Sequence, residues 1–112
     1  MNEQLEKEEI LSIFKEIEKD PVATQRTVSH KLGISLGKTN YLLRELIKKG
    51  LIKAKHFSDN PQKLKKIQYL LTEKGFEEKL RLTYYFLQRK ETEYSHLKEE
   101  WERLTVNNRK EG

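Results

Sequence analysis

Apolar residues in the first twenty positions recur with the spacing of a single helix face. They occupy positions i, i+3, i+4 and i+7, as Ile10, Ile13, Phe14 and Ile17. This spacing is typical of an amphipathic helix that packs on a core. Asp20-Pro21 follows, and a proline disfavours helical geometry at the residue before it. The pattern predicts a first helix over roughly residues 4–19, with an acidic outer face that would be kept away from DNA.

A second, shorter apolar pattern begins after this break. Val28 and Leu32 lie four residues apart and share one face of a helix. Thr24 is a candidate N-cap, because its hydroxyl can accept a hydrogen bond from a free N–H group of the first turn. Gly33 suits the left-handed backbone that often ends a helix. These residues predict a short helix followed by a tight turn.

The next helix has a clearer division between its two faces. Ser35 is its candidate cap and Gly50 its end, while Thr39, Leu42, Leu43 and Leu46 form the inward stripe. Two helices that cross through a glycine-containing turn predict a helix-turn-helix, whose second helix enters the major groove of DNA. The residues that this pattern leaves pointing outward are Gly37, Lys38, Asn40, Tyr41, Arg44 and Lys48.

Residues 51–71 alternate in polarity on either side of a turn-rich segment. Residues 51–57 and 66–71 read as strands, and Ser58 to Lys63 contains the Asp, Asn and Pro typical of turns. A β-hairpin after a helix-turn-helix predicts the wing of a winged helix. Lys63 and Lys65 would contact DNA phosphates from this wing. Alternatively, its lysines protect the hairpin edge from pairing with other strands.

The C-terminal third predicts one long helix. Thr72 is its candidate cap, and no helix breaker follows between Gly75 and Leu104. Residues there repeat with 4-3 spacing over four heptads, which predicts a coiled-coil seam between two copies of the chain. The candidate dimer-interface residues are Leu80, Thr83, Leu87, Tyr94, Leu97 and Trp101. Alternatively, this stripe packs on the chain's own first helix. The pattern is compatible with parallel or antiparallel dimer helices.

Charge is distributed unevenly along the 112 residues. The net charge is +5, but residues 1–20 carry −4, residues 21–75 carry +9 and residues 76–112 are balanced. A basic segment centred on a helix-turn-helix is the expected footprint of a phosphate-binding face. The alternative is a generic solvated basic surface.

The composition of the chain excludes several other classes of protein. The chain has no cysteine, so it forms no disulfide framework and no thiolate metal site. No apolar run is long enough to span a membrane, and the acidic N-terminus is unlike a signal peptide. We therefore expect no membrane partner and a cytoplasmic location, at the bacterial nucleoid.

Together these patterns predict a mainly α fold with a small β-hairpin (α+β). The expected organisation is a winged helix-turn-helix DNA-binding domain over residues 1–75, a dimerisation helix over residues 76–106 and a flexible tail over residues 107–112. The candidate DNA-binding residues are Thr24, Arg26, Ser35, Gly37, Lys38, Asn40, Tyr41, Arg44, Lys48, Lys63 and Lys65.

The run from Thr24 to Ile52, the basic hairpin and the exit Leu71-Thr72-x-x-Gly75 resemble the MarR family of winged-helix regulators. The long C-terminal helix and short length are similar to the MarR-type regulators associated with exopolysaccharide gene clusters. The resemblance implies a dimeric transcription factor on a pseudo-palindromic site, with Gly37, Lys38, Asn40, Tyr41 and Arg44 facing bases and phosphates. Gly37 and Thr39 depart from the family pattern, which usually has a small hydroxyl residue and a buried aliphatic there. The chain lacks the length for the effector pocket of larger members, and no small-molecule effector is evident.

Catalysis has little support in the sequence. His30, His56 and His96 lie in three different elements, without metal-ligand spacing, and no glycine-rich phosphate loop or nucleophile elbow is present. We expect a protein that is not an enzyme and has no cofactor or metal. Two functions remain: a sequence-specific DNA-binding regulator, and a winged-helix module that joins proteins through its long helix.

Overall fold

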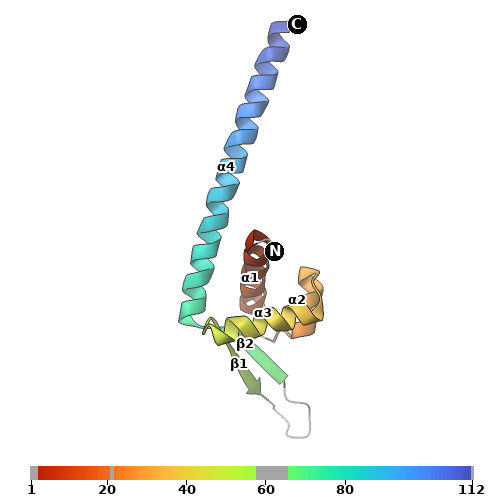
Figure 1. The fold of residues 1–112 in the computed structure, drawn as a ribbon, viewed down its shortest axis with the longest axis vertical. Coiled ribbons are helices and arrows are strands. Elements are labelled where there is room, and N and C mark those ends of the chain that lie inside the picture. Colours follow the sequence, from red (N-terminus) through yellow and green to blue (C-terminus); the bar gives the residue numbers. More distant parts are fainter. Residues whose placement is uncertain (1–2, 21, 58–65, 112) are drawn as a thin grey trace. The chain divides into compact units, whose positions relative to one another are not determined.

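The computed structural model describes residues 3–20, 22–57 and 66–111. Its elements are α1 (Glu3–Lys19), α2 (Gln25–Leu32), α3 (Leu36–Lys48), β1 (Ile52–Phe57), β2 (Lys66–Leu71) and α4 (Glu73–Glu111) (Figure 1). Helices dominate and the two strands form an antiparallel hairpin, which confirms the predicted fold class. The chain divides into two compact units, Met1–Leu80 and Arg81–Gly112.

Side-chain hydrogen bonds set the beginning of α2, and a left-handed glycine sets its end. Thr24 is the N-cap, with its Oγ1 accepting from the Thr27 N–H at 3.1 Å, and Thr27 Oγ1 accepts from the Thr24 N–H at 2.9 Å. This reciprocal arrangement satisfies two N–H groups that a helix start leaves free. Gly33 ends the helix at φ +68°, where a side chain would be strained.

The start of α3 is fixed in the same way. Ser35 Oγ accepts from the Lys38 N–H at 3.1 Å. Thr39 is fully buried, and its hydroxyl donates to the Ser35 carbonyl at 2.9 Å. A buried hydroxyl is therefore satisfied within the helix itself, which explains how threonine occupies a core position. After the helix, Gly50 turns the chain at φ +76° toward β1.

The core of the first unit is built from the predicted helix stripes. α1 contributes Ile13, Phe14 and Ile17, and Leu11 is buried beside them, while Ile10 is only half-buried. The other buried apolar residues of this unit include Ala23, Val28, Leu42, Leu43, Leu46, Leu51, Ile52 and Tyr69. This single core packs α1, α2, α3 and the base of the hairpin together.

The hairpin is joined to the start of α4 by close backbone packing. β1 and β2 pair from Ile52 opposite Leu71 to Phe57 opposite Lys66. Thr72 caps α4 by accepting from the Gly75 N–H at 2.9 Å, and its hydroxyl donates to the Gly50 carbonyl at 2.7 Å. A Cβ atom on Gly75 would overlap the Leu51 carbonyl oxygen. The Thr72-x-x-Gly75 sequence thus lets α4 begin in direct contact with the backbone of Gly50 and Leu51, which follow α3.

Helix α4 is longer than the sequence pattern predicts. In the structure α4 continues to Glu111, through most of the segment from residue 107 that the sequence predicts as a tail. Nothing in residues 105–111 breaks a helix, since Asn has only modestly lower helix propensity than its neighbours. The compact first unit also extends to Leu80, beyond the boundary expected at residue 75.

Candidate nucleic-acid interface

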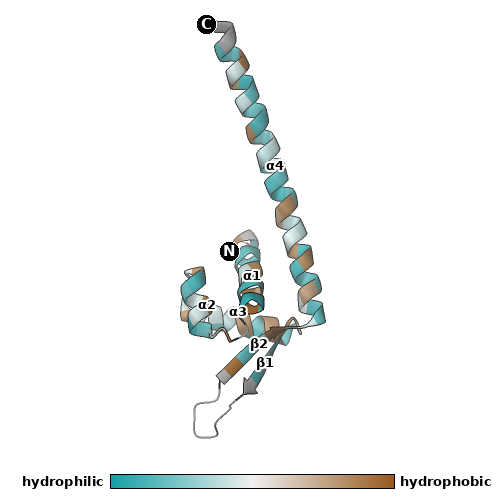
Figure 2. Cartoon of the chain, turned by 180° about the vertical axis from the view of Figure 1, so that it is seen from behind, coloured by the Kyte–Doolittle hydropathy of each residue, from teal (hydrophilic) through white to brown (hydrophobic). Residues whose placement is uncertain are grey.

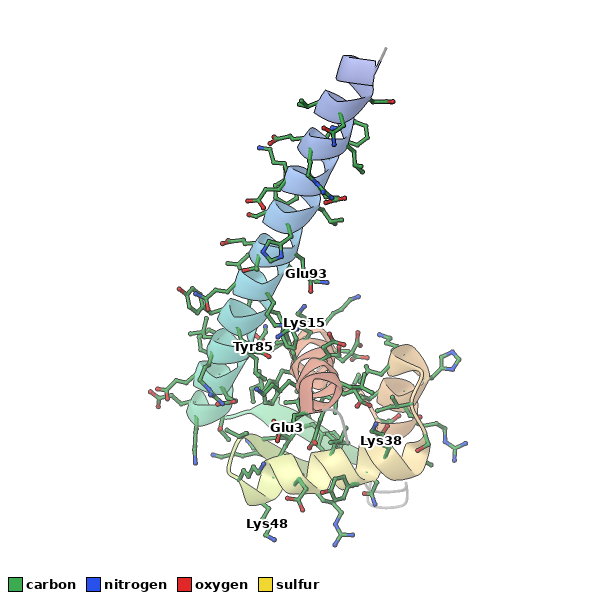
Figure 3. All side chains as sticks on the ribbon, turned by 45° about the horizontal axis from the view of Figure 1, so that its top comes forward. Glu3, Lys15, Lys38, Lys48, Tyr85 and Glu93 are labelled. Atoms are coloured by element: carbon green, nitrogen blue, oxygen red, sulfur yellow. The ribbon has the colours of Figure 1, made fainter. Side chains whose placement is uncertain are left out.

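One face of α3 carries an uninterrupted exposed stripe. Gly37, Tyr41, Arg44 and Lys48 are all exposed, and Tyr41 retains 58% of its accessible surface. Their spacing of four, three and four residues aligns them along the helix axis. Lys48 projects from the outer side of α3 (Figure 3). The stripe therefore presents a phenol, a guanidinium and an ammonium on the helix that a helix-turn-helix inserts into DNA.

Lys38 lies beside this stripe but is engaged elsewhere. Its Nζ lies 2.9 Å from Glu9 Oε1 of α1, and the two side chains keep 44% and 9% of their exposure. Glu9 Oε1 is buried and accepts no hydrogen bond of good geometry among the described residues. The distance therefore indicates an ion pair without a directed hydrogen bond. Lys38 is labelled on the side of α3 that faces α1 in Figure 3.

Asn40, at the edge of the stripe, belongs to a polar network across three elements. Gln25 Nε2 of α2 donates to Asn40 Oδ1 at 3.0 Å and to the Tyr69 hydroxyl of β2 at 3.2 Å. Asn40 and Gln25 are half-buried, and Tyr69 is buried. The network joins the recognition helix to the helix before it and to the wing.

The remaining candidate DNA-binding residues differ in whether their side chains take part in helix capping. Thr24 and Ser35 cap helices through their hydroxyls, which accept from the Thr27 and Lys38 N–H groups. Arg26 is exposed at the start of α2. Lys63 and Lys65 lie outside the described residues. The DNA-binding role of all these residues stays a prediction.

Sequence reasoning missed Gln25 and Glu9. Neither belongs to an apolar stripe or a basic cluster, so periodicity does not single them out. Glu9 is part of a wider arrangement in which acidic residues of α1 hold lysines of other elements. Glu16 lies 3.1 Å from Lys31 of α2, and Glu18 pairs with Lys79 of α4. The acidic face of α1 is thus used for internal ion pairs, and these reduce the free positive charge of the domain.

The first unit also has a groove between α1 and the α2–α3 turn. Its volume is about 630 Å³. The ion-paired residues Glu9, Glu16, Lys31 and Lys38 line it, together with Leu5 and Ile34. Within the described part of the chain, no three His, Asp or Glu side chains gather as a metal site. Among the described helices, none has the length and apolar content needed to cross a lipid bilayer.

Along α4, hydrophobic residues recur among hydrophilic ones (Figure 2). Several large apolar side chains of this helix form an exposed row. In the second unit, Leu87 is 51%, Tyr94 67%, Leu97 71% and Trp101 68% exposed. Leu80, in the first unit, is 57% exposed, and Thr83 is exposed as well. Such a row is longer than the scattered exposed leucines of an ordinary surface, and rows of this kind mark interaction surfaces.

Comparisons with known proteins agree with this geometry. Residues 8–53 match the family described as winged helix-turn-helix DNA-binding. No curated protein matches the chain. Among solved structures, the PcaV transcriptional regulator from Streptomyces coelicolor, in complex with its natural ligand, is similar with a TM-score of 0.65 and 19% identity, over 77% of this chain and 59% of that one.

Two proteins of Staphylococcus aureus have the same fold. MepR, determined as a DNA complex, aligns with a TM-score of 0.63 and 22% identity over 80% of this chain and 61% of its own. MarR, in complex with salicylate and kanamycin, aligns with a TM-score of 0.59 and 22% identity over 77% of this chain and 55% of its own. This chain therefore spans 55% to 61% of the length of these three proteins. Its first unit is a winged helix-turn-helix domain, in the fold that MarR and these other regulators share.

Proposed function

We propose that this chain is a MarR-like transcriptional regulator that binds a pseudo-palindromic DNA site as a homodimer. The exposed α3 stripe of Tyr41, Arg44 and Lys48 carries the proposal, because side chains of these types can read bases and bind phosphates and a recognition helix enters the major groove. Arginine can donate two parallel hydrogen bonds to a guanine edge, so Arg44 is the principal candidate for base recognition.

Fold similarity supports the DNA partner. MepR, which shares this fold, forms a complex with DNA. The net charge of +9 over residues 21–75 favours the same partner, although the ion pairs of Lys31 and Lys38 with α1 leave less of that charge free. Lys48, Lys53 and Lys55 are exposed in the described part of this segment and are available to phosphates.

The exposed apolar row of α4 supports the homodimer. Leu80, Leu87, Tyr94, Leu97 and Trp101 repeat with heptad spacing, and a second copy of the same helix offers a matching surface. Two domains joined in this way would recognise two half-sites, and a two-fold dimer matches a pseudo-palindrome. No effector is included in the proposal.

Selection of bound sites from a random duplex pool tests the proposal. We expect an inverted repeat with half-site centres about one helical turn apart, roughly 34–36 Å. Binding to the selected duplex should weaken steeply with salt, because phosphate contacts release counterions. Failure to enrich any sequence, together with weak binding that is equal on all duplexes, would contradict a sequence-specific regulator.

The resemblance to exopolysaccharide-associated regulators extends the proposal to the target genes. We propose that the protein acts at the bacterial nucleoid on promoters of an exopolysaccharide gene cluster. Chromatin immunoprecipitation in the source bacterium checks this extension. Enrichment confined to promoters unrelated to exopolysaccharide synthesis would overturn the target assignment and leave the DNA-binding proposal intact.

The α4 row also favours a second function, a winged-helix module that joins proteins. In that case the long helix would bind a different protein and the basic face would contribute little. Size measurement of the isolated chain separates the two, since a self-association seam predicts a dimer without any other protein. A monomer that binds no duplex would favour the interaction module.

A further inference from the structure

We infer that Gln25 determines which bases Asn40 selects, by fixing the orientation of the Asn40 side-chain amide. The inference rests on the proposed function, because it names a specificity-determining contact of the same recognition helix. It concerns the network of Gln25, Asn40 and Tyr69 that connects α2, α3 and β2.

The direction of the hydrogen bonds carries the argument. Gln25 Nε2 has two hydrogens, and it donates one to Asn40 Oδ1 at 3.0 Å and the other to the Tyr69 hydroxyl at 3.2 Å. Both bonds are partly buried, so water competes with them less than at an open surface. The carbonyl side of the Asn40 amide is therefore turned toward α2, and its NH2 group has no partner among the described residues.

The position of Asn40 makes this orientation relevant to recognition. Asn40 lies three residues after Gly37 and four residues before Arg44, both members of the exposed stripe. Residues at these separations are neighbours on a helix surface. The Asn40 amide is thus next to the groups that would enter the groove, while its carbonyl is held by a residue of the preceding helix.

An asparagine with a free amide pairs with adenine, since its carbonyl accepts from N6 and its NH2 donates to N7. Asn40 presents a donor instead, because Gln25 holds its carbonyl. A donor matches bases whose major-groove edge offers an acceptor without an amino group, and these are guanine and thymine. Adenine and cytosine carry an amino donor that would face the Asn40 NH2.

Reversing the hydrogen-bond direction at Gln25 tests the inference. Gln25→Glu can only accept, so it should accept from the Asn40 NH2 and the Tyr69 hydroxyl and turn the Asn40 carbonyl outward. First, Asn40→Ala identifies the base pair whose preference depends on Asn40. At that pair we expect the parent to prefer guanine or thymine on the contacted strand by about tenfold, and Gln25→Glu to prefer adenine or cytosine. The readout is the affinity ratio between duplexes in which only that pair is inverted.

Controls separate orientation from charge and folding. Gln25→Glu adds a negative charge that weakens binding on every duplex, and Gln68→Glu adds the same charge on β2 without entering the network. Gln68→Glu should lower affinity and keep the parent ratio. Gln25→Leu removes the hydrogen bonds at similar volume and should bring the ratio toward one, with thermal melting confirming the fold. If Gln25→Glu does not fold, the affinity ratio of Gln25→Leu alone tests the inference.

Two outcomes would overturn the inference. One is an unchanged preference at the Asn40 pair in Gln25→Leu or in folded Gln25→Glu, and the other is an Asn40→Ala variant with every parent preference intact. In both cases the parent still selects an operator, and the proposed function stands. A parent that selects no operator contradicts the proposed function itself, and with it this inference.

Discussion

Lys38 Nζ lies 2.9 Å from Glu9 Oε1, so an ion pair joins the first turn of α3 to α1. The Glu9 side chain keeps only 9% of its exposure, and a carboxylate in that setting has lost most of its hydration. The Lys38 ammonium supplies the compensating charge. In this structure Lys38 serves the packing of the recognition helix on α1, in addition to any contact with DNA that the sequence predicts.

Lys38→Ala should therefore act mainly on stability. It leaves the Glu9 carboxylate without its partner, and we expect the free energy of unfolding to fall by about 1–2 kcal/mol. This is less than the loss for a fully buried pair, because solvent screens the half-exposed lysine. Denaturant unfolding measures the loss, and the double variant Glu9→Gln/Lys38→Ala should recover part of it. If stability is unchanged and the salt slope of DNA binding falls by about 0.9, Lys38 is a phosphate ligand instead.

Gly75 and Gly37 form a matched pair of glycine substitutions. A methyl group at Gly75 would overlap the Leu51 carbonyl oxygen, whereas a Cβ at Gly37 meets nothing within 4 Å. We expect Gly75→Ala to destabilise the domain by about 1–3 kcal/mol through forced backbone displacement. Gly37→Ala should be neutral or stabilise it by up to about 1 kcal/mol, because alanine favours the helix. Thermal melting of both variants checks this. Equal melting temperatures would mean that the start of α4 can move away from Leu51 at little cost.

Arg44 is the residue on which the DNA-binding proposal can be tested most directly. Arg44→Lys keeps the charge and loses the two-pronged hydrogen bonding, while Arg44→Ala loses both. If Arg44 reads a guanine, both variants should lose about 1–3 kcal/mol of preference at one position of each half-site. If it binds a phosphate, Arg44→Ala should weaken all duplexes alike and Arg44→Lys should be mild. Parent-like affinity of both variants for the selected operator would show that α3 is not the recognition helix.

The exposed row of α4 predicts the effect of a charge in the proposed seam. Leu87→Glu places an unpaired carboxylate where a second copy would pack, at a cost of several kcal/mol. We expect this variant to sediment as a monomer at micromolar concentration. Thr92→Glu adds the same charge at an exposed position outside the 4-3 stripe and should remain dimeric. A dimeric Leu87→Glu variant would move the interface to another surface, such as α1.

Interactions between residues close together in the chain explain why much of this fold can be predicted from the sequence. The caps Thr24 and Ser35 and the left-handed glycines Gly33 and Gly50 act within one helical turn, so their residue types are sufficient to predict the element ends. The inward stripe of α3 follows from the helical period in the same way. The sequence does not determine where α4 ends, because polar residues without a helix breaker neither extend nor stop a helix.

The chemistry of the candidate interface depends on partners far away in the chain. Lys38 follows Gly37 by one residue, which places it roughly 100° around α3 from Gly37, at the border between the inward and outward faces of the helix. The ion pair with the buried Glu9 carboxylate of α1 holds the Lys38 side chain toward α1. The sequence predicts only that Asn40 points outward, whereas residues of α2 and β2 determine the direction of its amide. Hydrogen-bond geometry and burial exist only after the elements pack, so the sequence by itself determined which helix presents polar groups, and the tertiary structure decided which of them are free.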